Sequence, residues 1–376
     1  MKASILQENL ARAVSRTNRI VSSKPALPIL SHLLLVAKKE GLLVTASTVE
    51  TTEEVFVGAK TEKEGGLCVP AKIFSELVSS LPQDAVTIEE KEGSLLVSCG
   101  GARATVAGMS AGEFPPAKKE AGKDDKKAAK KNVTIKKDAL VSILSFVLFA
   151  AATDDGRPLL TGVKIVQKEE GALFAATDGY RLSTYQSSLV FGPATDILVP
   201  GRALAEVLRV CQEEKEAGDP TLSDDGSGDL VIVVGDTTIV TRRIDGQYPN
   251  FEKIIPTGHT TTAAPDKEAL MKAVKSASIF ARDSANIVRL RITKNTLTIS
   301  ANAPQVGENA VTLDARTEGD DGDIAFNSRF LLELLANFPG EELTFEMTGS
   351  LNPGAFRSPK DPRLLHIIMP VRVSSG

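Results

Sequence analysis

Apolar residues follow a helical period in some stretches of the chain and a strand period in others, and this succession occurs three times. Three segments carry apolar residues every three or four positions, which predicts helices with one buried face. They are residues 5–21, 135–151 and 265–281. Leu10, Leu140 and Leu270 take equivalent places in them, 130 residues apart. Because the spacing is constant, the pattern predicts an internal repeat.

A second helix follows each first helix at nearly the same interval. A short apolar run leads into an amphipathic stretch in residues 67–82, 197–212 and 324–339. Pro70, Pro200 and Asn327 precede these stretches and are typical of helix starts. Between the helices, apolar and polar residues alternate around Gly or Asn turns, which predicts antiparallel strands and hairpins. Each unit is therefore expected to be helix, strands, helix, strands, an α+β arrangement.

Two polar segments separate the predicted units. Residues 117–132 are rich in Lys, and residues 256–265 (PTGHTTTAAP) are small and polar. We therefore expect domains at 1–117, 133–256 and 257–376, with a Lys-rich linker at 118–132. That linker either is solvated or touches phosphate, and the solvated alternative is favoured.

Composition restricts the class of protein and its compartment. Cys68, Cys99 and Cys211 include no CxxC pair, which argues for reduced thiols and against a disulfide framework or a metal site. The N-terminal residues lack the apolar core of a secretory signal. The longest apolar run, residues 139–152, is too short to cross a bilayer. We expect a cytoplasmic protein without a membrane partner.

Cationic side chains recur on the predicted helices although the net charge is −4. Arg12, Arg16 and Arg19 share one face of the first helix. Lys272, Lys275 and Arg282 form a similar stripe in the third repeat, whereas the second repeat lacks one. Helices that line a common hole would meet phosphates without reading bases. The alternative is an ordinary solvated face. The absence of Trp disfavours single-strand binding by stacking.

Four short segments resemble one family, the bacterial sliding clamps that form the β subunit of DNA polymerase III. They are KPALPILSH (24–32), ATDGYRLS (176–183), YPNFEKIIP (248–256) and HIIMPVRV (366–373). The resemblance extends over the whole chain. It implies three tandem DNA-clamp domains, each with two helices on antiparallel sheets, which close as a head-to-tail homodimer into a six-domain ring. It also implies a non-catalytic processivity factor without a cofactor, which a clamp loader places on double-stranded DNA.

The resemblance further implies three sets of site residues. Short peptides of the polymerase and other partners would dock between the second and third domains, where apolar walls suit Leu or Phe anchors. The matching positions are Leu160, Thr177, Gly179, Tyr180, Arg181, Leu182, Pro249, Lys253, Ile254, Phe330, Ile367, Ile368, Met369, Pro370, Val371 and Arg372. Sequence-independent DNA contacts would come from Lys24, Lys72, Arg157 and Arg202. Ile279 and Phe280 would lie at the seam of the ring.

The sequence departs from the family pattern in several places. TASTVET (45–51) replaces an acidic motif, and Ala285 stands where an aromatic residue is frequent. The loop at 154–158 lacks the usual aromatic residues, and Ser374–Gly376 extends past the usual end.

Two other classes of protein compete with the clamp. An enzyme is disfavoured because the three His are widely spaced and no phosphate-binding loop is present, and Asp178 is interpreted as a turn residue and not as a catalytic acid. A repeat-built interaction scaffold that never meets DNA is the second alternative.

Overall fold

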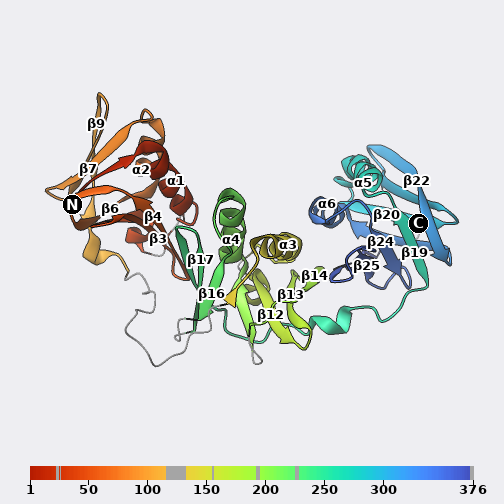
Figure 1. Cartoon of the computed structure of the whole chain (residues 1–376). Helices are drawn as coiled ribbons and strands as arrows, with labels where there is room; N and C mark the ends of the chain where they lie inside the picture. Colours follow the sequence, from red (N-terminus) through yellow and green to blue (C-terminus); the bar gives the residue numbers. More distant parts are fainter. Residues whose placement is uncertain are drawn as a thin grey trace. The chain divides into compact units, whose positions relative to one another are not determined.

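The computed structural model describes residues 1–22, 25, 27–115, 133–154, 156–191, 195–224 and 228–372. Each third of the chain contributes two α-helices, as the repeat predicts (Figure 1). They are α1 (Gln7–Asn18), α2 (Ala71–Ser80), α3 (Lys137–Val147), α4 (Gly201–Glu213), α5 (Lys267–Ala281) and α6 (Ser328–Asn337). The strands pair antiparallel throughout these ranges, so the predicted repeated α+β fold is confirmed.

Helices α5 and α6 begin where the sequence supplies an acceptor for free backbone N–H groups, whereas α1 and α2 have no side-chain cap. Asp266 Oδ1 accepts a hydrogen bond from the Ala269 amide at 2.8 Å and so caps α5. Asn327 Oδ1 accepts one from the Arg329 amide at 2.9 Å and caps α6 in the same way. Because the cap fixes the start of α6, it also fixes which α6 side chains face the neighbouring sheet.

The described chain divides into two compact units, of which the first comprises Met1–Lys137 and Arg209–Arg243. It contains a five-stranded sheet, β5-β1-β7-β8-β9, and a nine-stranded sheet, β10-β6-β2-β3-β4-β18-β17-β16-β11. The strands are β1 (Lys2–Leu6), β2 (His32–Lys38), β3 (Gly41–Ser47), β4 (Thr51–Gly58), β5 (Lys60–Lys63), β6 (Gly65–Pro70), β7 (Ala85–Lys91), β8 (Ser94–Cys99), β9 (Ala102–Ala107), β10 (Met109–Ser110), β11 (Val133–Thr134), β16 (Thr221–Asp224), β17 (Asp229–Val234) and β18 (Thr237–Arg242).

Pairing of β4 with β18 joins the first and second thirds of the chain within this unit. Thr51 lies opposite Thr241, and Val55 lies opposite Thr237. The apolar faces of α1 and α2 pack with the strands into one core, in which Leu10 and Phe74 are fully buried. A continuous backbone ladder therefore reinforces the covalent connection between these two thirds.

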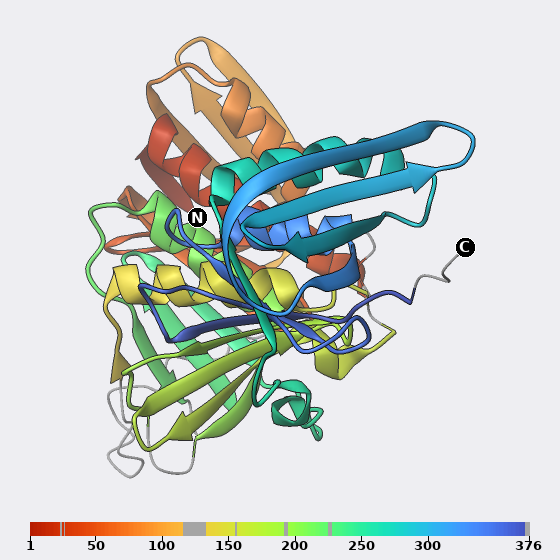
Figure 2. The ribbon, with the colours of Figure 1, turned by 90° about the vertical axis from the view of Figure 1, so that its right-hand side faces the viewer.

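The second unit comprises Asp138–Leu208 and Ile244–Gly376 and contains one twelve-stranded sheet, β15-β12-β13-β14-β26-β25-β24-β19-β22-β21-β20-β23. Its strands are β12 (Gly162–Lys168), β13 (Gly171–Thr177), β14 (Arg181–Gln186), β15 (Asp196–Pro200), β19 (Thr261–Pro265), β20 (Ile287–Thr293), β21 (Thr296–Ala303), β22 (Gly307–Gly319), β23 (Gly322–Asn327), β24 (Thr344–Met347), β25 (Gly354–Arg357) and β26 (Leu364–Ile368). Helix α5 lies along the long β21–β22 hairpin (Figure 2).

Pairing of β14 with β26 joins the second and third thirds of the chain within the second unit. Arg181 lies opposite Ile368, and Tyr185 lies opposite Leu364. Residues that the chain separates by 179 to 187 positions thus become neighbours, and the candidate site lies where this pairing ends. No helix in the described ranges is both long and apolar enough to cross a membrane.

Candidate functional site

The site forms where the C-terminal segment passes from the end of β26 toward β23. Beyond β26, the Met369 amide donates a hydrogen bond to the Tyr180 carbonyl at 2.9 Å. The Val371 amide then donates to the carbonyl of Ala325, on β23, at 2.8 Å. Residues 369–371 therefore lie between the turn that follows β13 and the strand that precedes α6. The sequence motifs at 176–183 and 366–373 meet at this place.

The turn between β13 and β14 is held by side chains of the TDG motif. Asp178 Oδ1 accepts hydrogen bonds from the amides of Tyr180 at 2.9 Å and Arg181 at 3.0 Å. Thr177 Oγ1 accepts one from the Gly179 amide at 3.0 Å. Gly179 has φ +89°, a region that side chains with a Cβ rarely adopt. Asp178 is therefore a turn residue, as the sequence predicts.

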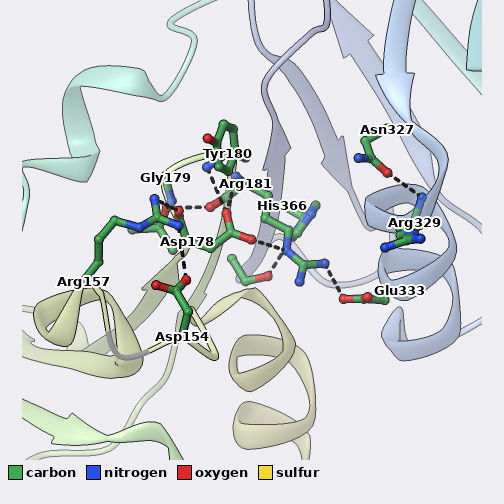
Figure 3. A network of polar contacts seen from close by, with 12 residues as sticks. Asp154, Arg157, Asp178, Gly179, Tyr180, Arg181, Asn327, Arg329, Glu333 and His366 are labelled. Atoms are coloured by element: carbon green, nitrogen blue, oxygen red, sulfur yellow. Dashed lines mark hydrogen bonds and ion pairs between the residues drawn. The ribbon is translucent and has the colours of Figure 1, made fainter. Parts of the chain in front are cut away.

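Arg181 lies at the centre of the site, and Figure 3 shows it between Asp178 and Glu333. Its Nε donates to Asp178 Oδ2 at 3.1 Å, and its Nη1 forms an ion pair with Glu333 Oε2 at 2.6 Å. Its guanidinium carbon lies 5.5 Å from the ring centroid of Phe149 and 4.7 Å from that of Phe330. Only 7% of the side chain is exposed. Such enclosure suits Arg, whose planar group combines ion pairs with ring contacts.

An aromatic surface lies beside Arg181 and faces solvent. The Tyr180 ring stacks on Phe330, with centroids 6.3 Å apart and planes 22° apart, and Tyr180 is 58% exposed. Arg157 Nη1 donates to the Asp178 carbonyl at 2.6 Å, and its guanidinium lies 5.7 Å from the Tyr180 ring centroid. The structure thus places Arg157, which the resemblance assigns to DNA, beside residues that the resemblance assigns to the peptide site.

The other face of the β14–β26 pair is covered by the segment that leads into the third domain. Phe251 packs there in a cluster with Leu182 and Ile367, and Ile254 packs against this cluster. Tyr248 Oη accepts a hydrogen bond from the Thr177 amide at 3.0 Å, and burial raises the pKa of Tyr248 to about 12. This covering segment carries the exposed residues Pro249 and Lys253.

The residues that the resemblance assigns to the peptide site therefore fall into two groups. Buried members lie on both faces of the β14–β26 pair or in the turns beside it, and they are Leu160, Thr177, Arg181, Leu182, Ile367 and Ile368. Exposed or half-buried members form the surface, and they are Gly179, Tyr180, Pro249, Lys253, Ile254, Phe330, Met369, Pro370, Val371 and Arg372. Of the two groups, the surface group is the one accessible to solvent.

Sequence reasoning missed Phe149, Glu333 and His366. His366 is completely buried on β26, its Nδ1 lies 2.7 Å from Ser183 Oγ, and its ring centroid lies 5.2 Å from that of Phe149. Its Nε2 has no hydrogen-bond partner among the described residues. Burial and, to a smaller degree, the Arg181 charge lower the pKa of His366 well below 6.5. Strand alternation would have placed His366 and Ile368 on one face, and the i, i+3 relation would have placed Glu333 beside Phe330.

The cationic stripe predicted on α1 is only partly present. Arg16 is 2% exposed and donates hydrogen bonds to Thr237 Oγ1 and Glu214 Oε1, both at 2.7 Å. Arg19 Nη1 donates to Glu213 Oε1 at 2.6 Å. The predicted cationic face, whether it meets phosphates or solvent, is wrong for Arg16, because acidic residues from later in the chain meet this part of α1.

The remaining predicted contact residues lie at separate places. Lys72 and Arg202 are exposed in the first turns of α2 and α4, whereas Lys24 lies outside the described residues, as do the Lys-rich linker and residues 374–376. Ile279 is 56% exposed on α5, and the neighbouring Phe280 is half-buried. An exposed Ile on an amphipathic helix is an apolar surface without a partner in the described chain.

Comparisons with known proteins agree with this geometry. Family models of the DNA polymerase III beta subunit match residues 1–118 (N-terminal domain), 134–250 (central domain) and 252–372 (C-terminal domain). The beta sliding clamp of Synechococcus elongatus is 29% identical over 384 residues that cover all of both chains. That of Bacillus subtilis is 28% identical over 99% of this chain and 100% of the relative.

Solved structures are similar over the same length. The DNA polymerase sliding clamp of Bacillus subtilis superposes with a TM-score of 0.90 at 25% identity and 99% coverage of both chains. The DNA polymerase III beta chain of Streptococcus pneumoniae also gives 0.90, at 25% identity, over 99% of this chain and all of that one. The resemblance drawn from the four sequence motifs is thereby confirmed, and the chain belongs to the DNA polymerase III beta subunit family of bacterial sliding clamps.

Proposed function

We propose that two copies of this chain close into a ring around duplex DNA and hold the replicative polymerase and other partner proteins there. The observation that carries the proposal is the threefold α+β repeat, which is matched over its length by the beta-subunit models. The ring stays on DNA by topology, so its contacts with DNA are weak and independent of sequence. It performs no catalysis, and the Asp178 carboxylate is used in the turn and in the ion pair with Arg181.

Open sheet edges support ring closure by a second copy. Exposed strand edges are ready to pair with another chain, and proteins usually protect them with charges or by keeping them short. Three edge strands of the first unit are protected, because β5 is mostly charged and β10 and β11 have two residues each. The fourth edge strand, β9, is less protected, since Arg103 is its one charged residue. In the second unit, the described residues 307–314 of β22 pair with β21 alone.

Exposed apolar residues lie near these two edges. Leu96, on the neighbour of β9, is 36% exposed, and Ile73 on α2 of the same unit is 58% exposed. Val306, next to β22, is 54% exposed, and Ile279 lies on the helix that packs along β22. We infer that β9 of one copy meets β22 of the other, with these side chains buried in the seam. This inference gives the head-to-tail homodimer, with Ile279 and Phe280 at the seam.

One cation at the same position of each repeat supports contact with DNA. Lys72, Arg202 and Arg329 are the second residues of α2, α4 and α6, and all three are exposed. Lys and Arg on helices contact phosphates and carry no sequence information. We propose that these residues face the DNA, together with Lys24. The position of Arg157 beside Tyr180 favours a role at the peptide site.

The surface around Tyr180 supports docking of partner peptides. Tyr180, Phe330, Met369 and Pro370 expose apolar atoms around the buried Arg181. Aromatic residues and Met are enriched at the centres of protein interfaces, and Met adapts to different partners. We propose that peptides of the polymerase, the clamp loader and other proteins place Leu or Phe side chains here.

A topological experiment tests the proposal. The protein is loaded by its cognate ATP-driven loader onto nicked circular DNA, and the bound fraction is measured before and after the circle is cut. Retention on the circle and loss after linearisation are expected. If the protein stays bound after the circle is cut, it binds DNA through an ordinary surface. Complete absence of association with DNA would favour the scaffold alternative.

A further inference from the structure

We propose that Glu333 is a specificity-determining residue of the peptide site. Because its negative charge offsets the positive charge of Arg181, the site selects against peptides that place an acidic side chain on the Phe330 ring. This inference rests on the peptide-docking function proposed above. It starts from the two carboxylates that flank Arg181, one in the turn before β14 and the other on α6.

The two carboxylates have different roles. Asp178 uses Oδ1 for the amides of Tyr180 and Arg181 and Oδ2 for Arg181 Nε, and its side chain is 13% exposed. It is therefore committed to the turn. Glu333 lies 2.6 Å from Arg181 Nη1 with 49% of its side chain exposed. Glu333 is the carboxylate that an incoming peptide meets.

Helix α6 places Glu333 beside the surface that a peptide would cover. Phe330 and Glu333 are three positions apart and so lie on one side of the helix. The Phe330 ring covers the Arg181 guanidinium at 4.7 Å and stacks with Tyr180 at 6.3 Å. A side chain that packs on the Phe330 ring therefore comes close to Arg181, which Figure 3 shows in its ion pair with Glu333.

The three charged groups in contact at Arg181 sum to one negative charge. Arg181 contributes one positive charge, and Asp178 and Glu333 contribute two negative charges. Arg157, which contacts the Tyr180 ring, lies 3.6 Å from Asp154 through its Nη2 and is therefore itself paired with a carboxylate. An acidic peptide residue over Phe330 thus meets repulsion in place of the attraction that Arg181 alone would provide.

The experiment compares affinity ratios of matched peptides. The probes are capped pentapeptides with Leu and Phe anchors that carry either Gln or Glu at one other position, and each position is tested in turn. Fluorescence polarisation gives the affinity of the full-length wild type, Glu333→Gln and Glu333→Asp. Glu268→Gln is the matched control, because Glu268 forms an exposed helical ion pair of the same 2.6 Å length with Lys272 on α5.

The expected result is a change in the ratio. One charge removed at roughly 7 Å in a largely aqueous dielectric shifts the ratio of Glu-peptide to Gln-peptide affinity by about three- to fivefold. Glu333→Gln should show this shift at the position over Phe330, and Glu333→Asp and Glu268→Gln should keep the wild-type ratio. The shift should shrink at about 0.5 M salt, where the Debye length is about 4 Å.

Two outcomes overturn the inference in distinguishable ways. If Glu333→Gln weakens both peptides of every pair equally, or changes neither, Glu333 has a structural role or none, and its role in specificity is refuted. If the wild type binds no peptide of any pair, the docking function itself fails, and the inference about Glu333 fails with it.

Discussion

Acidification should destabilise the second unit through His366. The imidazole is completely buried and its pKa lies well below 6.5 in the folded protein, first because of burial and then because of the Arg181 charge. In the unfolded chain its pKa is about 6.5. The folded state therefore binds fewer protons than the unfolded state below that pH. Stability is full above about pH 6.5 and decreases as the pH falls toward the folded-state pKa.

The size of the effect follows from proton linkage. If His366 stays neutral in the folded state, one group titrates only in the unfolded state, and the free energy of unfolding decreases by about 1.4 kcal/mol between pH 7.5 and 5.5. Carboxylates with lowered pKa, such as Glu213 and Asp361, titrate below this window. Asn at position 366 retains a polar group near Ser183 but does not titrate, so His366→Asn should lose this part of the pH dependence.

The chain offers a selective probe for the measurement. It has no Trp and three Tyr, and Tyr180, Tyr185 and Tyr248 all belong to the second unit. Tyrosine fluorescence in urea titrations therefore reports the unfolding of that unit alone. Wild type and His366→Asn are compared at pH 7.5, 6.5 and 5.5. The same decrease in both proteins would refute the assignment of this pH dependence to His366.

Three further changes test the seam, the surface and the turn. Ile279→Asp places a charge at the proposed seam and should give monomers by light scattering. A dimeric mass would show that Ile279 does not lie at the seam. Met369→Ala combined with Pro370→Ala should weaken binding of a Leu- and Phe-anchored peptide in calorimetry without lowering the melting temperature, and unchanged affinity would place the pocket elsewhere. Gly179→Ala forces a Cβ into φ +89° and 3.0 Å from Arg157 Nη1, so it should cost about 1–2 kcal/mol in urea unfolding; an unchanged midpoint would contradict the need for glycine there.

The repeat was predictable because helical and strand periods are local properties of the sequence. The first helix of each third has its buried side where the period places it, with Leu10, Leu140 and Leu270 all buried. The turn role of Asp178 was predictable for the same reason, since an Asp before Gly bonds to amides within a few positions. The family models show three tandem domains, and the exact boundaries given for them in the sequence analysis stay a prediction.

The long-range partners were not predictable from periodicity. The position of Arg16 on α1 indicates a polar face, but Thr237 and Glu214, which bury it, come from about 200 residues later. The pairing of Ser183 with His366 likewise depends on the register of β14 and β26. No local sequence pattern encodes that register. In the sequence analysis, only the family resemblance placed the two segments in one site.

The strand pairings β4–β18 and β14–β26 have a mechanical consequence for the proposed ring. Each third of the chain is fastened to the next by a ladder of backbone hydrogen bonds, and a ladder under shear resists force because all of its bonds bear the load together. A seam between copies has no covalent connection behind it. Tension applied by a loader would therefore open the ring at that seam. Each subunit would then be deformed little and would store little elastic energy.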